Sequence, residues 1–211
     1  MRHLMLCVSS VAFTIAPAVA LAQSPRAATY ISDEDIKKVN SLPGVDRQIV
    51  SVDIGKLNEA VGIIHRGPTT GAGTTGRGDA ARGAAPPAEP CGQGGTAPAG
   101  AVNGIAHDSQ TETYVIVSGG GTLVTGGRIL NGRKSAPDSE VTRVLNGPSC
   151  TGIIAGPDVV RKQVKTGDVI IIPAGVPHGW TDITDHVDYL SVRPDPDRVL
   201  AKDYVHPVLK K

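Results

Sequence analysis

The run from Gly167 to His178 constrains the fold more than any other part of the chain. A turn dipeptide opens it, four apolar residues rich in β-branching follow, and a Pro-Ala-Gly corner leads to a histidine that starts the next segment. Two short strands joined by a tight corner would hold the His178 ring in one direction, as a metal ligand requires. Far upstream, His107 and Glu112 offer the same kind of ligand chemistry.

Short strand-like segments dominate the chain from Ile105 onward, and Gly-rich or Pro-Asp turns separate them. No amphipathic segment of helix length lies between them, so the pattern predicts a β-sandwich or barrel. The expected strands are Thr111–Val117, Gly121–Thr125, Val141–Asn146, Gly152–Ile154, Val159–Val164, Val169–Ile172, His178–Thr181 and Val187–Val192.

The part of the chain before this region predicts one short helix and two strands. Ser32 is a helix N-cap followed by three acidic residues, and the helix should end before Pro43. Strands are expected over Gln48–Ile54 and Ala60–His65. We therefore divide the chain into a leader (1–22), a helical segment (23–46), early barrel strands (47–66), a Gly/Pro/Ala-rich loop (67–100), a barrel core (101–195) and a C-terminal tail (196–211).

The first 22 residues are typical of a secretory signal peptide. A basic start precedes an apolar run from Leu4 to Ala20, and Ala20-Leu21-Ala22 is a small-residue cleavage pattern. A membrane anchor is the alternative, although the run is short and Pro17 interrupts it. Cleavage would remove one of 21 basic residues, leaving 20 against 20 acidic. The sequence therefore predicts an exported protein, periplasmic or extracellular, with no basic surplus for nucleic acid or acidic membranes.

Two cysteines would remain in the exported chain. Cys7 lies in the leader, so Cys91 and Cys150 would meet an oxidising compartment, where a disulfide forms. Two unrelated thiols are the alternative. The segment 67–100 has few large apolar groups to offset its ordering entropy, so we expect a long loop anchored at Cys91.

Two motifs resemble those of the cupin family. Gly167 to His178 fits the second cupin motif, G-x5-P-x-G-x2-H, in full. His107, Glu112 and Gly119 fit the second His, the Glu and the Gly of the first motif, H-x-H-x3/4-E-x6-G, whereas its first His falls on Ile105. The resemblance covers roughly residues 101–195, and the second motif is the more specific of the two.

This resemblance implies an all-β fold, the cupin double-stranded β-helix or jelly-roll barrel, with a short N-terminal helix and one divalent metal ion inside. The matching ligands are His107, Glu112 and His178, two imidazoles and a carboxylate that resemble the facial triad of non-haem iron sites. Iron, manganese, zinc, nickel, cobalt and copper all suit this set. Cupins commonly pair through strand edges, so the resemblance also implies a homodimer.

The sequence offers two reserve ligands, Asp108 and His65. Alternate residues of a strand share a face, so His107 and Glu112 can both point inward only if a bulge or turn lies near Ser109. A shorter alignment would use Asp108 instead of His107. A lost imidazole could also be replaced by His65, at the end of an apolar strand, which we favour over His186.

Four further residues are candidates for the substrate pocket or for proton transfer. Trp180 shares the parity of His178 and could stack on a flat substrate, and Ile116 shares the face of Glu112. Tyr114 and Asp182 are the candidate catalytic groups that handle protons. The structural alternatives are core packing for Trp180 and Tyr114, and a turn position for Asp182.

These features favour an exported metal-dependent enzyme that acts on a small organic molecule, with a dioxygenase as the expected type. A non-redox lyase, isomerase or decarboxylase would use the same metal to stabilise an enolate. A non-catalytic protein that binds a metal or a small molecule is the alternative of a different class, and the missing first-motif His supports it.

Overall fold

A computed structural model describes residues 27–69 and 88–210. The predicted signal peptide and the central part of the Gly/Pro/Ala-rich loop lie outside these residues. Within them the chain is almost entirely β-structure, as predicted. The elements, in chain order, are α1(Asp33–Asn40), β1(Asp46–Asp53), β2(Asn58–Arg66), β3(Pro90–Cys91), β4(Val102–His107), β5(Glu112–Thr125), β6(Arg128–Lys134), η1(Val141–Leu145), β7(Ser149–Ala155), β8(Val160–Lys165), β9(Val169–Ile172), β10(His178–Thr181), β11(Val187–Asp195), β12(Tyr204–Val205) and η2(Pro207–Leu209).

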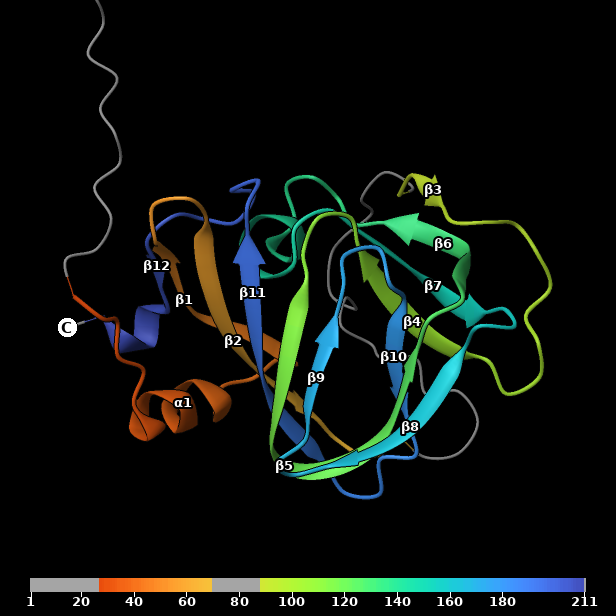
Figure 1. Cartoon of the computed structure of the whole chain (residues 1–211), viewed down its shortest axis with the longest axis horizontal. Helices are drawn as coiled ribbons and strands as arrows, with labels where there is room; N and C mark the ends of the chain where they lie inside the picture. The colour runs from red at the N-terminus through yellow and green to blue at the C-terminus, as the bar shows by residue number, and fades with distance from the viewer. Residues whose placement is uncertain (1–26, 70–87, 211) are drawn as a thin grey trace, which may run out of the picture.

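Strand β5 joins two antiparallel sheets that face each other (Figure 1). Its first half pairs with β9 and β11, and the first sheet continues through β2 and β1 to β12. Its second half pairs with β8 and β10, and the second sheet continues through β4, β7 and β6 to β3. This arrangement is the predicted double-stranded β-helix.

The bend of β5 between the sheets depends on Gly119, the glycine that matches the first motif. Its φ is +67°, and a Cβ atom built on it would lie 2.0 Å from the carbonyl oxygen of His186. A side chain at this position would therefore clash with the backbone of the neighbouring segment. Glycine allows one strand to leave the first sheet and enter the second.

Two apolar clusters fill the molecule on either side of the first sheet. The larger lies between the sheets and includes Tyr114, Leu123, Trp180 and Tyr189. The other packs helix α1, through Val39, against the opposite face of β1 and β2. The helix begins as predicted, because Ser32 and Asp35 form a reciprocal capping box. Within the described residues, no helix is long and apolar enough to cross a membrane.

One predicted strand is wrong. Residues 141–145 form a single helical turn of π type, η1, instead of a strand. Among the apolar residues of this stretch only Leu145 is buried, and the hydroxyl of the buried Thr142 donates to the Ala136 carbonyl. A short β-branched run could not distinguish a strand from a buried turn.

The predicted disulfide is present. Cys91 and Cys150 are joined with their Cα atoms 6.0 Å apart, and the bond spans a sequence separation of 59 residues. It attaches β3, which lies in the segment predicted as a loop, to β7. The described end of that segment is therefore fixed to the second sheet.

Candidate metal centre

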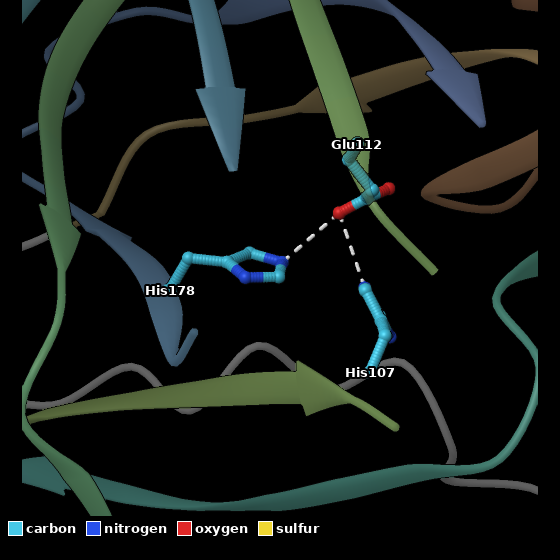
Figure 2. A group of neighbouring side chains, drawn as sticks. All are labelled: His107, Glu112 and His178. Carbon is cyan, nitrogen blue, oxygen red and sulfur yellow. Dashed lines mark hydrogen bonds and ion pairs between the residues drawn. The ribbon is translucent and has the colours of Figure 1, made fainter. Parts of the chain in front are cut away.

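Three ligand-type side chains converge inside the barrel. His107 is the last residue of β4, Glu112 is the first residue of β5, and His178 is the first residue of β10. Each has a side-chain exposure of 4% or less. One ligand atom from each lies within 4.8 Å of the other two. Figure 2 shows the two imidazole rings pointing at the same carboxylate oxygen.

Local backbone geometry brings the two motifs together. The chain bends at residues 108–109, between β4 and β5, so His107 and Glu112 both point inward despite their odd spacing. The Pro-Ala-Gly corner of the second motif contacts the first motif directly, because the Gly175 amide donates to the His107 carbonyl at 2.7 Å. The corner therefore fixes the end of β4 as well as the start of β10.

The hydrogen bonds around His107 determine which ring nitrogen carries its proton. Nδ1 lies 2.9 Å from Oγ of Ser149, and that hydroxyl donates its single proton to the Gly147 carbonyl at 2.8 Å. Ser149 can therefore only accept from His107, which places the imidazole proton on Nδ1. The Nε2 atom of the neutral ring then presents a lone pair to Glu112 Oε2, 3.1 Å away.

His178 has the same arrangement. Its Nδ1 lies 3.1 Å from the Val176 carbonyl, which can only accept a hydrogen bond, so the proton of the neutral ring is again on Nδ1. Its Nε2 faces Glu112 Oε2 at 3.1 Å. Two nitrogen lone pairs thus meet one carboxylate oxygen, an arrangement that a shared cation would stabilise.

A proton is a poor substitute for that cation. Burial lowers the pKa of His107, although the carboxylate of Glu112 opposes the shift, and the neighbouring His178 lowers the pKa further. Protonating both rings would place two positive charges at rings whose centroids lie 5.0 Å apart. The donor set of two imidazoles and a carboxylate oxygen fits a divalent transition metal.

The second oxygen of Glu112 is held by a buried arginine that the sequence reasoning missed. Oε1 accepts from Arg193 Nε at 2.9 Å and from the Ser191 hydroxyl at 2.7 Å. Arg193 is 1% exposed and also donates to Asp46 and Gln48. Only Oε2 is left to face the two imidazoles.

Arg193 also supplies positive charge to the buried glutamate. Burial by itself would raise the pKa of Glu112, but the polar groups around the carboxylate outweigh it and hold the pKa well below the usual range, with the Arg193 guanidinium as the permanent cation among them. The alternation of inward-facing and outward-facing residues along β11 could have placed Arg193 in the interior. Val187, Tyr189 and Ser191 point inward, and the same alternation places Arg193 on that face, one position beyond the predicted end of the strand.

Tyr114 contacts the cluster as a donor. Its hydroxyl donates to Glu112 Oε2 at 2.8 Å, and its ring lies edge-on to His178 with centroids 6.0 Å apart. Burial raises the pKa of Tyr114 well above 10, and the charge of Glu112 raises it further. Tyr114 therefore stays protonated at neutral pH, so it donates a hydrogen bond to Glu112 and cannot act as a base.

The two residues predicted for the substrate pocket lie in the main core. Ile116 is 1% exposed and Trp180 is 8% exposed. The Trp180 ring packs beside Tyr189 with centroids 5.3 Å apart. Both face the barrel interior, as parity predicted, where they contribute to packing.

Three other candidates lie outside the cluster. Asp182, a candidate catalytic group, takes the turn position that was its structural alternative: β10 ends at Thr181, and Asp182 is exposed with φ +52°. The reserve ligand Asp108 is exposed and pairs with Lys134 at 2.6 Å. The reserve ligand His65 lies on the outer face of β2, where it pairs with Asp188 at 2.6 Å.

The placement of both motifs decides the fold family. The first motif runs from the end of β4 into β5, the strand shared by two facing sheets, and the strand-corner-strand of the second motif delivers His178 to the same interior point. The chain has the cupin fold.

Comparison with known proteins finds similarity at low sequence identity only. The sequence matches no protein-family model and no curated protein. Among solved structures, an uncharacterized conserved protein with a double-stranded β-helix domain from Klebsiella pneumoniae is 13% identical, with a TM-score of 0.39, 81% of this chain and 93% of that chain covered. A recombinant oxalate oxidase in complex with glycolate is 13% identical, with a TM-score of 0.34, 74% of this chain and 54% of that chain covered. The capsular polysaccharide assembling protein CapF from Staphylococcus aureus is 11% identical, with a TM-score of 0.31, 71% of this chain and 28% of that chain covered.

Proposed function

We propose that this protein is a metal-dependent cupin enzyme that acts on a small organic molecule, and that His107, Glu112 and His178 hold one divalent metal ion. The observation that carries the proposal is the meeting of two imidazole lone pairs at one carboxylate oxygen inside the barrel. Three protein ligands would leave coordination positions open for a substrate.

Each residue has a definite part in this proposal. A bound divalent metal would polarise a coordinated substrate or, if it is redox-active, activate oxygen. Ser149 and the Val176 carbonyl fix the tautomers of the two imidazoles. Arg193 and Ser191 hold one oxygen of Glu112, and Tyr114 donates a hydrogen bond to the other.

The neighbourhood of the cluster favours an oxygenase over a non-redox lyase or isomerase that abstracts a substrate proton. Abstraction of a substrate proton needs a base. Asp182, the acidic candidate for that role, is exposed and outside the cluster, and Tyr114 is held protonated. We therefore propose a dioxygenase-type reaction, which relies on the metal and not on a side-chain base.

The burial of the cluster favours one other function. The three ligand side chains are 2–4% exposed, which suits a protein that sequesters a metal ion as well as one that presents it to a substrate. A non-catalytic metal-binding protein is thus the second candidate.

Metal titration tests the site itself. The purified protein, stripped with a chelator, is titrated by calorimetry with Mn²⁺, Co²⁺, Ni²⁺ and Zn²⁺. We expect one site per chain, loss of that site in His178→Ala, and no change in the control His65→Ala, which removes an exposed imidazole outside the cluster. Equal binding by wild type and His178→Ala would show that the proposed site does not exist.

Oxygen uptake separates the two functions. Protein loaded with iron or manganese is supplied with small hydroxylated and aromatic compounds in an oxygen electrode, and zinc-loaded protein serves as the redox-inert control. Substrate-dependent uptake by the iron or manganese form alone supports the dioxygenase. Turnover by the zinc form points instead to the non-redox enzymes, and tight metal binding without any turnover points to sequestration.

We also propose that the protein is exported to the periplasm or the cell exterior. The Cys91–Cys150 disulfide supports this, because such bonds persist in oxidising compartments. The homodimer stays a prediction. Strand β9, at the edge of the first sheet, exposes Val169 and Ile171 and is where a second copy could pair.

A further inference from the structure

Arg66 brings an unused positive charge to the barrel. It is the last residue of β2, two positions after the core residue Ile64 and therefore on the same face of the strand. Its Nε donates to the Tyr189 hydroxyl at 2.9 Å. Among residues 27–69 and 88–210, no side chain or carbonyl accepts from its two terminal nitrogens. The guanidinium is half-buried, so these donors are available to a ligand.

Trp180 offers a second free donor beside the same tyrosine. Its ring centroid lies 5.3 Å from that of Tyr189, and the residue is buried, with 8% of its surface exposed. Its indole nitrogen has no hydrogen-bond partner in the described part of the chain. A buried donor without an acceptor is unfavourable, so this nitrogen indicates a missing acceptor.

Aromatic rings connect these donors to the metal centre. Tyr189 lies against Tyr114 with ring centroids 4.3 Å apart, and the Tyr114 hydroxyl reaches Glu112 at 2.8 Å. Arg66, Trp180 and the cluster of His107, Glu112 and His178 therefore lie around the same pair of tyrosine rings, Tyr189 and Tyr114.

A bound metal would add positive charge to an interior that already holds several arginines. Glu112 and Asp46 are negative, Arg193 pairs with both of them, and Arg66 and the buried Arg47 are further cations near these carboxylates. A divalent metal would add two positive charges. Among the described residues, Glu112 is the only acidic side chain in the cluster that could offset them. Buried charge without a partner is strongly unfavourable, so a bound anion would complete the site.

We propose that the barrel interior binds a small carboxylate anion, with the terminal nitrogens of Arg66 and the indole N–H of Trp180 as its donors. This inference rests on the proposed metal-dependent function, because it assigns that enzyme a carboxylate-bearing substrate. A planar guanidinium binds a carboxylate through two parallel hydrogen bonds, which a neutral molecule cannot match.

Trp180 supplies the assay, since it is the only tryptophan of the chain. Succinate is titrated into metal-free and zinc-loaded protein while the emission of Trp180 is recorded, and succinamide, its uncharged counterpart, is the control ligand. We expect a saturable change with succinate, tighter in the zinc form, and little change with succinamide. Succinamide binding as tightly as succinate would overturn the proposal, as would the absence of any saturable response in both forms.

Variants identify the donors. Arg66→Gln should weaken succinate binding at least about tenfold, the loss expected for one charge-assisted contact, whereas Arg66→Lys should retain part of the affinity. The control Arg133→Gln removes an exposed arginine from β6 and should bind as the wild type does. Trp180→Phe, followed by calorimetry, should weaken binding less than Arg66→Gln. Unchanged affinity in Arg66→Gln, with a wild-type circular dichroism spectrum, would overturn the assignment.

The two proposals can fail separately. If His178→Ala abolishes metal binding while Arg66→Gln has no effect on succinate, the metal centre stands and the anion subsite fails. If wild type and His178→Ala bind metal equally, the metal centre fails, and the titration of metal-free protein still decides whether Arg66 binds an anion.

Discussion

Ser149 is the residue on which the orientation of His107 depends. Its hydroxyl accepts from Nδ1 and donates to Gly147, so its loss leaves the ring free to place its proton on Nε2, the atom that faces the metal site. We expect Ser149→Ala to weaken metal binding about 10- to 100-fold, the usual effect of losing such a partner. Calorimetric titration measures this.

Ser51→Ala is the matched control for that variant. Ser51 is equally buried, on β1, and its hydroxyl has no partner in the described residues. Its metal affinity should equal that of the wild type. If the two variants bound metal alike, the tautomer of His107 would not depend on Ser149.

Arg193 and Glu112 form a buried ion pair whose loss should be costly only when one partner remains. Arg193→Met would leave the carboxylates of Glu112 and Asp46 without their shared cation, and we expect it to lower the free energy of unfolding by about 3–5 kcal/mol. The double variant Glu112→Gln/Arg193→Met should lose clearly less unfolding free energy than the sum of the losses in the two single variants. Denaturant unfolding of the four proteins gives the cycle, and simple additivity would contradict direct coupling.

At the scale of single elements, the approach of β10 to β4 sets the position of His178. A Cβ atom built on Gly179 would lie 2.4 Å from the Asn103 carbonyl, and one built on Gly104 would lie 2.4 Å from the His178 carbonyl. Glycine at both positions lets the backbones come close enough for His178 to reach Glu112, the carboxylate that His107 also faces.

Gly179→Ala should therefore push the two strands apart. We expect a loss of stability of roughly 1–3 kcal/mol, as for overpacking in a core, together with weaker metal binding because His178 moves with β10. Gly94→Ala is the control, since a Cβ there would meet nothing within 4 Å. Thermal unfolding of the two variants provides the comparison, and equal midpoints would argue against a close contact at Gly179.

The elements also show what the sequence could and could not predict. Strands β9 and β10 match their predicted bounds, because turn residues delimit apolar runs on both sides. Strand β6 was missed, since Arg128–Lys134 alternates polar and apolar residues only weakly. Strand β5 was predicted as two strands, because local reasoning interprets Gly119 and its neighbours as a turn although the strand bends there and continues.

The same limit applies to the site. Motif spacing predicted that His107, Glu112 and His178 would converge, because each occupies a fixed position in a recognisable pattern. The partners of these residues depend on contacts between distant strands. Arg193 reaches Glu112 across 81 sequence positions, and Ser149 reaches His107 across 42. Strand alternation places Arg193 on the inner face of β11 but does not identify its partner, and no local pattern marks Ser149 as part of the site.

At the scale of the whole molecule, the disulfide ties the segment after residue 88 to the second sheet. Because the bond between Cys91 and Cys150 spans 59 positions, closing its loop stabilises the folded state by about 4 kcal/mol in the chain-entropy treatment. We expect Cys91→Ser/Cys150→Ser to lose stability of that order. Cys150 directly follows Ser149, so the same variant should also weaken metal binding.

Denaturant unfolding of the double variant, beside the wild type with and without reductant, checks the expectation. The reduced wild type should behave as the double variant does. A variant as stable as the oxidised wild type would show that packing alone holds β3 against β6 and β7.

Acid stability belongs to the whole molecule as well, because Asp53 joins the first sheet to the C-terminal segment. The Asp53 carboxylate accepts from Arg198 at 3.1 Å and from the Gly55 amide at 2.8 Å, and it pairs with Lys202 at 3.3 Å. The hydrogen bond from Arg198, followed by that from Gly55, holds the pKa of Asp53 well below its usual value.

A depressed carboxyl pKa stabilises the folded state at pH values above the pKa of the unfolded chain, about 3.9, and this stabilisation is lost as the pH falls toward the folded-state value. Asp53→Asn should therefore be less stable than the wild type at pH 7, and the difference should shrink steadily below about pH 4. Asp138→Asn, which removes an exposed carboxylate, is the control and should follow the wild-type curve. Denaturant unfolding of all three proteins between pH 7 and pH 2 gives their free energies of unfolding. If the difference between Asp53→Asn and the wild type stayed constant over this range, the charge of Asp53 would not link the C-terminal segment to β1.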